Sequence, residues 1–150
     1  MAIRDLSLSD LDVITEIDQL CFPPGIAFDR EVFEYCLSQE FCRGFGVERE
    51  GRLAAFAIIN FTGPRSMQIV TIDVLPEHRG QGLARTIMSE IEGAARGHDV
   101  RRIVLQVSTQ NETAIALYQK WGFQIKSVLP DYYARGMDAF LMDKKILPQT

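Results

Sequence analysis

The stretch "LPEHRGQGLAR", residues 75–85, ends an apolar run with a proline and leads through two glycines into a helical pattern. The first turn of a helix leaves its backbone N–H groups without helical partners, and such groups attract anions. Arg79 and Arg85 add positive charge beside them. Gly80 and Gly82 lack a Cβ atom and let the backbone come close to a ligand. The stretch therefore predicts a binding site for a phosphate-bearing ligand, between a strand and a helix.

Two familiar phosphate-binding loops do not fit this stretch. A P-loop requires a Gly-Lys-Ser/Thr ending, and no such lysine is present. A dinucleotide-binding fingerprint requires a third glycine where the sequence has Arg85, and the acidic residue expected downstream is misplaced, because Asp99 precedes its strand. The ligand must therefore be identified from a different pattern.

The hydrophobic periodicity on either side of the stretch predicts a mixed α/β sheet with helices on both faces. The predicted strands cover residues 2–6, 41–50, 52–61, 67–75, 101–108, 123–129 and 137–146, and the predicted helices cover residues 11–21, 29–38, 82–96 and 111–122. The resulting order is β-α-α-β-β-β-α-β-α-β-β. Short loops favour antiparallel pairing early in the chain, a hairpin at Glu50-Gly51 among them, and a parallel βαβ unit is expected after residue 69. Residues 130–136, "PDYYARG", are expected to form a loop.

Composition limits the class of protein. The 150 residues predict a single domain, 1–150, with an ordinary hydrophobic content of 47%. A net charge of −4 argues against nucleic acid as a partner, and no apolar segment is long enough to suggest a membrane span or a signal peptide. Three cysteines without a CxxC motif, together with only two histidines, predict a cytoplasmic protein that binds no metal.

Two blocks of the sequence resemble a known family. Arg79-x-x-Gly82-x-Ala84 is similar to the pyrophosphate-binding motif of the GNAT superfamily of acetyl-CoA-dependent N-acetyltransferases. The block "VLQVSTQNETAIALYQKWGF", residues 104–123, resembles a second motif of that family, and most of all its protein N-terminal acetyltransferases, including those of ribosomal-protein alanine. The resemblance covers essentially the whole chain and implies a GNAT-like central sheet of about seven strands flanked by about four helices.

The resemblance implies acetyl-CoA as the cofactor and places its binding residues along one strand, one turn and one helix. The backbone of the strand end would meet the pantetheine arm and polarise the acetyl carbonyl, in a gap between residues 69–75 and 102–108. The residues so implied are Ile72, Asp73, Val74, Arg79, Gly80, Gln81, Gly82, Leu83, Ala84, Arg85, Asn111 and Tyr118. Asn111 is also expected to cap its helix.

The catalytic groups implied by the family are present only in part. Tyr118 matches the tyrosine that acts as general acid toward the leaving thiolate. Gln106 stands where the family's carboxylate base usually lies, and Gln68 matches a base position of other branches. An amide cannot accept the proton at either position. Gln106 is instead expected to order water. Asp73 is the nearest carboxylate, but strand alternation places it on the face opposite Gln68 unless a bulge reorients the strand. A cysteine nucleophile is rejected, because buried thiols are commonly inert.

The acceptor is expected between two loops. The resemblance assigns substrate contacts to Phe22, Pro23, Pro24, Gly25, Tyr132 and Tyr133, with Asp131 where the family usually has asparagine. It implies acetylation of the N-terminal α-amine of a protein or peptide. Two alternatives stay open: acetylation of a small-molecule amine such as a polyamine, amino acid or drug, and a non-catalytic acyl-CoA-binding module. The sequence does not decide between a monomer and a homodimer.

Overall fold

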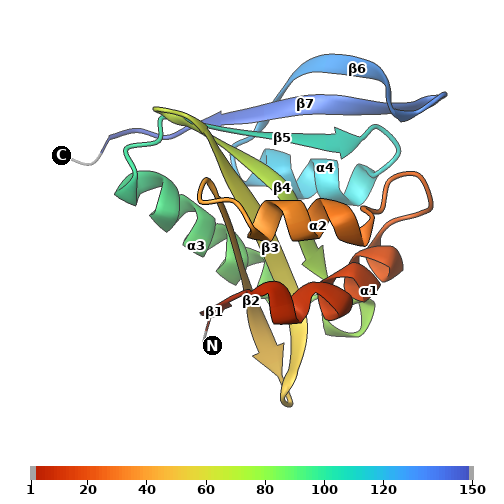
Figure 1. The fold of residues 1–150 in the computed structure, drawn as a ribbon. Coiled ribbons are helices and arrows are strands. Elements are labelled where there is room, and N and C mark those ends of the chain that lie inside the picture. The colour runs from red at the N-terminus through yellow and green to blue at the C-terminus, as the bar shows by residue number, and fades with distance from the viewer. Residues whose placement is uncertain (1–2, 149–150) are drawn as a thin grey trace.

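The computed structural model describes residues 3–148, which form one mixed sheet of seven strands in the order β1-β2-β3-β4-β5-β7-β6 (Figure 1). The strands are β1 (Ile3–Asp5), β2 (Cys42–Arg49), β3 (Arg52–Gly63), β4 (Ser66–Val74), β5 (Arg102–Ser108), β6 (Gln124–Ala134) and β7 (Met137–Lys145). Only β4 and β5 pair in parallel; the other neighbours pair antiparallel. The predicted order of elements and the parallel βαβ unit are confirmed.

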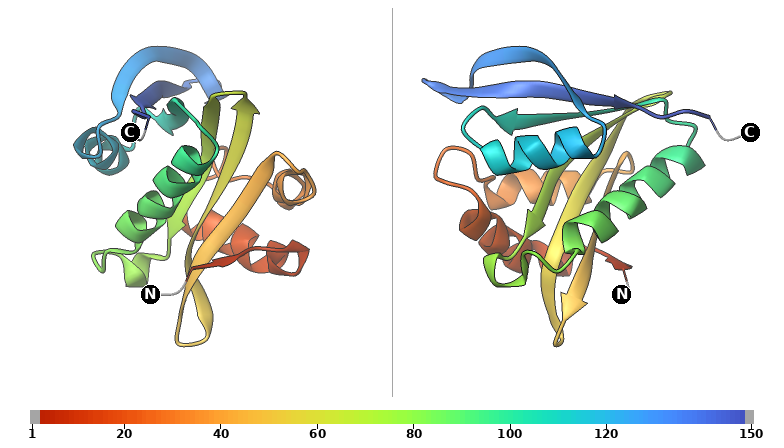
Figure 2. Two further views of the ribbon diagram at one scale, coloured as in Figure 1. Left: turned by 90° about the vertical axis from the view of Figure 1, so that its left-hand side faces the viewer. Right: turned by 180° about the vertical axis from the view of Figure 1, so that it is seen from behind.

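Four helices cover the two faces of the sheet. Helices α1 (Leu11–Cys21) and α2 (Arg30–Leu37) lie on one face, and α3 (Leu83–Gly97) and α4 (Glu112–Lys120) lie on the other (Figure 2). Each face has its own buried apolar cluster, because α1 and α3 both carry an apolar stripe with helical spacing. Short 3-10 turns, η1 (Leu8–Asp10) and η2 (Pro76–His78), precede α1 and α3.

The hairpin between β2 and β3 turns at the predicted position. Arg49 pairs with Arg52, and the two residues between them, Glu50 and Gly51, have φ angles of 54° and 76°. Positive φ at both central residues is the geometry that joins two strands through a two-residue turn. The turn lies at the same end of the sheet as the start of the stretch 75–85, because the Leu75 N–H bonds to the carbonyl of Ala54, three residues after Gly51.

Strands β4 and β5 separate at their carboxyl ends. Their pairing runs from Ser66 and Arg102 to Ile69 and Leu105, and the remaining residues of the two strands are not paired with each other. The arrowheads of β4 and β5 accordingly point apart in Figure 1. Such an opening beyond the carboxyl ends of parallel strands is where ligands enter open α/β sheets.

A bulge in β4 reverses the expected orientation of Asp73. Thr71 pairs with Ile58 and Ile69 pairs with Ile59, so Val70 is an extra residue in the ladder. After the bulge, Ile72 faces α3 and α4, whereas Asp73 faces α1 and α2. Uninterrupted alternation would have placed Asp73 on the opposite face from Gln68. The bulge is the exception that the expectation allowed, and it brings the two residues to the same face.

The loop expected at residues 130–136 is also corrected. Strand β6 continues through Ala134, and only two residues remain as the turn before β7. Asp131, with a φ of 53°, takes over part of the ladder through its own bonds: its N–H donates to Asp138 Oδ1, and its carboxylate accepts from the Gly136 N–H. Proline and aspartate indicated a turn in the sequence, whereas the structure uses them in an irregular edge strand.

Candidate active site

The turn before α3 has the open backbone that the sequence predicts. Gly80 and Gly82 have φ angles of 76° and 81°, which residues with a side chain rarely adopt. The first intrahelical bond of α3 runs from the Thr86 N–H to the Gly82 carbonyl. The N–H groups of residues 83–85 therefore have no helical partner and point out of the helix start. Gln81 and Arg85 are exposed beside them.

The two arginines of the turn differ in what they contact. Arg79 reaches back and donates from Nε to the carbonyl of Val74 at 3.1 Å. The thiol of Cys21, at the end of α1, donates to the same carbonyl at 3.3 Å. Both arginines are exposed, but Arg79 braces the turn against β4, whereas Arg85 extends from the first turn of α3.

The backbone of β4 faces the opening at alternate residues. The Leu75 N–H bonds to Ala54 on β3, so the neighbouring Val74 directs its backbone groups to the other side, as does Ile72. That side faces the opening between β4 and β5. Asp73, predicted together with them, instead directs its backbone to β3, and it contributes its side chain elsewhere.

Tyr118 and Asn111 take the positions expected of them on α4. Asn111 Oδ1 accepts from the Ala114 N–H at 3.2 Å, which confirms the helix cap. The Tyr118 ring packs edge-on against Trp121 and Phe123, with centroids 6.2 and 5.8 Å away. Burial, then the nearby charge of Asp73, raises the pKa of the Tyr118 hydroxyl above its usual value, so the hydroxyl keeps its proton at neutral pH.

The two glutamines at the family's base positions bind each other. Gln68 Nε2 donates to Gln106 Oε1 at 2.9 Å, across β4 and β5 near the point where the strands separate. Both amides lie on the α1 and α2 face of the sheet. They bridge the strands, and neither supplies a proton acceptor.

A buried carboxyl pair lies on the same face. Asp73 is 1% exposed and Asp18 of α1 is 0% exposed, and their carboxyl groups are within hydrogen-bonding reach of each other. Thr71 donates its hydroxyl to Asp73, and the Phe28 N–H donates to Asp18 Oδ2 at 2.7 Å. Burial, and then Asp18, raises the pKa of Asp73 well above its usual range.

Sequence reasoning missed Asp18. The available signal was its position on the apolar stripe of α1, next to Ile17 and four residues after Ile14, both of which are buried. A charged residue on a buried stripe requires a partner. Cys21, one turn later on the helix, remains a thiol because burial and the charge of Asp73 raise its pKa to about 11, in keeping with the rejection of a cysteine nucleophile.

The two loops assigned to the acceptor meet in space. A Cβ atom added to Gly25 would lie 3.2 Å from Met137 Sδ, so the segment 22–28 touches the end of the β6–β7 hairpin. Pro23 holds the segment in a turn by accepting from the N–H groups of residues 26 and 27. A hollow of about 400 Å³ opens there, lined by Gln19, Phe22, Pro24, Gly25, Ala27, Phe28 and Asp29.

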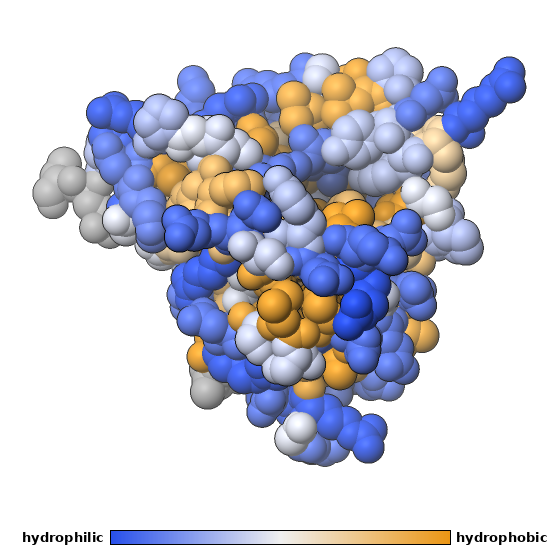
Figure 3. All heavy atoms as spheres, in the orientation of Figure 1, coloured by the Kyte–Doolittle hydropathy of each residue, from blue (hydrophilic) through white to orange (hydrophobic). Residues whose placement is uncertain are grey.

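Tyr132 and Tyr133 stand on the β6 side of these loops. Their rings pack edge-to-face with centroids 4.9 Å apart, and Tyr132 is half exposed. Tyr133 is near enough to Tyr118 to influence its pKa. The tyrosine pair of β6 therefore lies near the predicted general acid. On the face drawn in Figure 3, apolar side chains gather over α1, whose exposed apolar residues are Val13 and Leu20.

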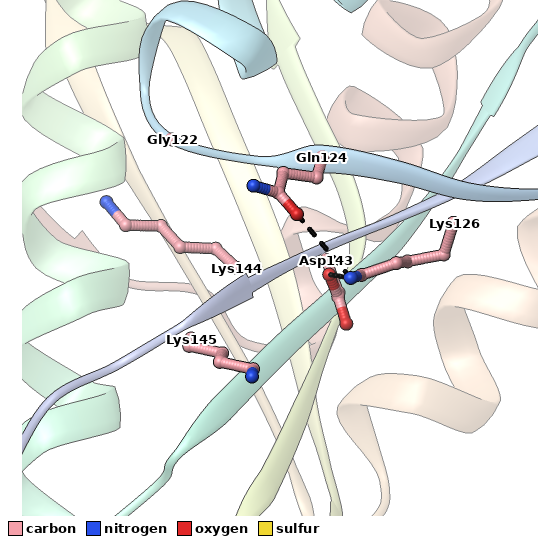
Figure 4. Close-up of a pocket in the computed structure, with 6 residues that line it drawn as sticks. All are labelled: Gly122, Gln124, Lys126, Asp143, Lys144 and Lys145. Carbon is pink, nitrogen blue, oxygen red and sulfur yellow. Dashed lines mark hydrogen bonds and ion pairs between the residues drawn. The ribbon is translucent and has the colours of Figure 1, made fainter.

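A second hollow lies at the other end of the sheet. Its volume is about 280 Å³, and Figure 4 shows its lining residues, which are Gly122, Gln124, Lys126, Asp143, Lys144 and Lys145. Asp143 is paired with Arg102 at 2.7 Å and with Lys126 at 3.8 Å. None of the predicted site residues lines this hollow, and its one carboxylate, Asp143, is neutralised by these ion pairs. Within residues 3–148, no group of three or more metal-ligating side chains occurs, and no helix is long and apolar enough to cross a membrane.

Comparison with known proteins gives a consistent result. Residues 11–123 match the model of the acetyltransferase (GNAT) family. A Bacillus subtilis protein, provisionally named a ribosomal-protein bS18-alanine N-acetyltransferase, is 30% identical over 94% of this chain and 93% of its own length. An N-alpha-acetyltransferase of Mycobacterium tuberculosis is 34% identical over 79% of this chain and 73% of its own.

A solved structure agrees with these relatives. The crystal structure of the ribosomal-protein-S18-alanine N-acetyltransferase of Escherichia coli superimposes with a TM-score of 0.87 at 25% identity. The superposition covers 99% of this chain and 96% of the other. The similarity therefore includes both the strand-turn-helix unit and the segments 22–28 and 130–136.

Proposed function

The chain belongs to the GNAT family of acetyltransferases, and from that premise we infer that it transfers an acetyl group from acetyl-CoA to the N-terminal α-amine of a protein or peptide. The observation that carries the proposal is the opening between β4 and β5, which has the open turn 80–85 at one end and Tyr118 on its α4 side. The names of the relatives support a protein α-amine as the acceptor. The proposal includes a cytoplasmic location, in keeping with cysteines that are free in the structure.

The donor site fits a pyrophosphate and an extended arm. The free N–H groups of residues 83–85 and the exposed Arg85 would hold the pyrophosphate, helped by the positive end of the α3 dipole. The backbone groups of Ile72 and the N–H of Val74 would bind the amides of the arm, and one of the two N–H groups would polarise the acetyl carbonyl. Acetyl-CoA supplies the thioester when bound.

Acetyl transfer forms a C–N bond and breaks the C–S bond of the thioester. The amine must lose one proton before it attacks, and the departing thiolate must gain one. Tyr118 would donate to the sulfur, and because a thiol has a pKa of about 8.5, little assistance is needed. Gln106 and the tyrosine pair Tyr132 and Tyr133 would position the amine and the water that takes up its proton.

The lack of a carboxylate at Gln68 and Gln106 selects among amines. Deprotonating an α-amine of pKa about 7.7–8.0 at pH 7 costs only about 1–1.4 kcal/mol, whereas a lysine of pKa about 10.4 costs about 4.6 kcal/mol. Water can take the proton from an α-amine but hardly from a lysine side chain. The site is therefore suited to α-amines and poorly suited to lysine side chains.

The lining of the acceptor hollow also favours a peptide over a polyamine. A polycation requires several carboxylates, and the seven lining residues include one, Asp29. Aromatic and proline side chains make up much of the rest. Such surfaces accommodate peptide side chains and backbone better than a string of ammonium groups.

A panel assay tests the proposal. Purified protein with acetyl-CoA would be offered peptides of varied N-terminal sequence, and separately polyamines, amino acids and aminated drugs, with products detected by mass spectrometry. The proposal expects acetylated peptide N-termini. Products formed only from small amines would favour a small-molecule acetyltransferase, and cofactor binding without any product would favour a non-catalytic acyl-CoA-binding module.

A further inference from the structure

The buried pair Asp18 and Asp73 connects the two halves of the site. Asp73 follows the bulge that sets the direction of the β4 backbone, and Asp18 accepts the Phe28 N–H at the end of the segment 22–28. The pair therefore joins the strand expected to receive the thioester to the loop expected to receive the acceptor. Neither residue belongs to the family motifs at residues 79–84 and 104–123.

The hydrogen bonding of the pair's oxygen atoms leaves room for one shared proton. Asp18 Oδ1 and Asp73 Oδ2 are buried and have no donor as long as both groups are carboxylates. The Phe28 N–H and the Thr71 hydroxyl already serve the other two oxygens. A single proton between the two carboxyl groups gives the remaining oxygens a partner and removes one of two buried negative charges.

We propose that Asp18 and Asp73 share one proton and, in that state, act as positioning residues that hold the acceptor segment 22–28 in place against β4. The proposal rests on the proposed function only in identifying the segment 22–28 as the part that receives the acceptor. The proton and the tie between α1 and β4 are properties of the folded chain and can be measured without any substrate.

The groups around the pair favour a single negative charge. Cys21 of α1 lies beside it as a neutral thiol, and Tyr118 of α4, whose pKa the charge of Asp73 raises, is a neutral phenol. Arg79, on the turn before α3, is the cation whose charge acts on Asp73. Thr71 contributes a neutral hydroxyl. One exposed guanidinium can balance one carboxylate, and a second negative charge would repel the first at close range.

Loss of the shared proton should therefore loosen the acceptor segment. As pH rises through the upper titration of the pair, the two carboxylates repel, and the bond from the Phe28 N–H to Asp18 weakens. In Asp73→Asn the hydrogen bond between residues 73 and 18 does not depend on pH, because the carboxamide N–H donates to Asp18. The carboxamide oxygen still accepts from Thr71. Asp73→Ala leaves Asp18 charged and without its partner.

A titration independent of activity tests the proton. Aspartate carboxyl carbons would be followed by NMR between acid and alkaline pH, together with hydrogen exchange at the Phe28 amide. We expect one titration far above the ordinary value of about 3.9, with loss of Phe28 protection over the same pH range. In Asp73→Asn the high titration disappears and the protection persists, whereas Glu16→Gln, which changes an exposed carboxyl on the same helix, matches the wild type.

Kinetics with an acceptor peptide test the positioning. The KM for the peptide in the wild type, divided by that in Asp73→Asn, cancels the titration of the peptide amine itself. We expect this ratio to rise with pH, and we expect Asp73→Ala to raise the peptide KM about tenfold while leaving the KM for acetyl-CoA unchanged.

Two results would overturn the proposal. One is ordinary titration of every aspartate, and the other is a peptide KM for Asp73→Asn as impaired as that for Asp73→Ala. If no peptide is acetylated at all, the proposed function fails, and the NMR titration still decides whether the pair holds its proton.

Discussion

The donor side and the acceptor side of the site are built in different ways. The predicted donor residues at 72–85 follow one another along a strand, a turn and the first turn of a helix. The acceptor side combines Asp18, the segment 22–28, Asp73 and the end of the β6–β7 hairpin, which come together only through the fold. A site built from consecutive residues can be recognised in the sequence, whereas a site built from distant segments depends on register and packing. The difference also predicts how each side responds to substitution.

The largest effect is expected where the donor side depends on a glycine. Gly82→Val introduces a β-branched side chain at a φ of 81° and should distort the turn, which costs about 1–3 kcal/mol. With the phosphate contacts also lost, we expect acetyl-CoA affinity to fall about 100-fold by calorimetric titration. Gly51→Val is the matched control, since Gly51 has a φ of 76° in the β2–β3 hairpin. It should lower stability and leave the affinity intact. Unchanged affinity in a folded Gly82→Val protein would refute the pyrophosphate placement.

A smaller effect is expected from removing one hydroxyl between the two sides. Tyr118→Phe keeps the ring that packs on Trp121 and Phe123 and removes the proton donor. We expect kcat to fall about tenfold, at the low end for general acid catalysis because a thiolate leaves easily, with acetyl-CoA affinity unchanged. Tyr35→Phe, on an exposed tyrosine of α2, should have no effect. Should kcat stay the same where chemistry limits turnover, Tyr118 serves only to pack the helix.

A carboxylate restored at position 106 should increase activity, in contrast to the two substitutions above. Gln106→Glu keeps an oxygen that can accept from Gln68 Nε2 and adds a group that can take a proton. We expect kcat near neutral pH to rise about threefold and its increase with pH to become shallower, as measured by steady-state rates from pH 6 to 9. The wild-type rate should keep rising as the substrate α-amine loses its proton. A slower Gln106→Glu enzyme would show that the position does not face the amine.

The smallest effect concerns stability. The pKa of Asp73 is raised in the folded protein by burial and by Asp18, so folding favours its protonated form. The resulting stabilisation is fully present below the unfolded pKa of about 3.9 and is lost as pH rises through the folded pKa. The carboxamide in Asp73→Asn does not titrate, so the free energy of unfolding should shift in favour of the variant as pH rises, by about 1 kcal/mol or more. Denaturant unfolding at pH 5 and pH 8 measures the shift, and a constant difference would contradict it.

The sequence predicted what depends on neighbouring residues. Glycines at 80 and 82 and the arginines beside them indicate an anion-binding turn wherever they follow a strand, and the turn was found as expected. The cap at Asn111 and the hairpin at Glu50 are local in the same sense. The family motifs added the role of Tyr118, which periodicity alone would have assigned to the core.

The features that the sequence did not predict depend on pairing between distant segments. The extra residue at Val70 is defined only by the register of β4 against β3, and it decides which face Asp73 occupies. Asp18 becomes a partner of Asp73 only when α1 packs on that face. The extension of β6 to Ala134 depends on bonds made by the side chains of Asp131 and Asp138. Apart from the position of Asp18 on the apolar stripe of α1, none of these contacts has a signal in the neighbouring sequence.

The most direct test of acetyl transfer to a peptide α-amine uses one peptide with a free N-terminus and an internal lysine. The wild-type protein would be incubated with the peptide and acetyl-CoA at pH 7, and fragment-ion mass spectrometry would locate the acetyl group. The difference of about 3 kcal/mol in deprotonating the two amines predicts acetylation of the α-amine in excess of 100-fold over the lysine. Comparable or greater acetylation of the lysine, or none of the α-amine, would contradict the account.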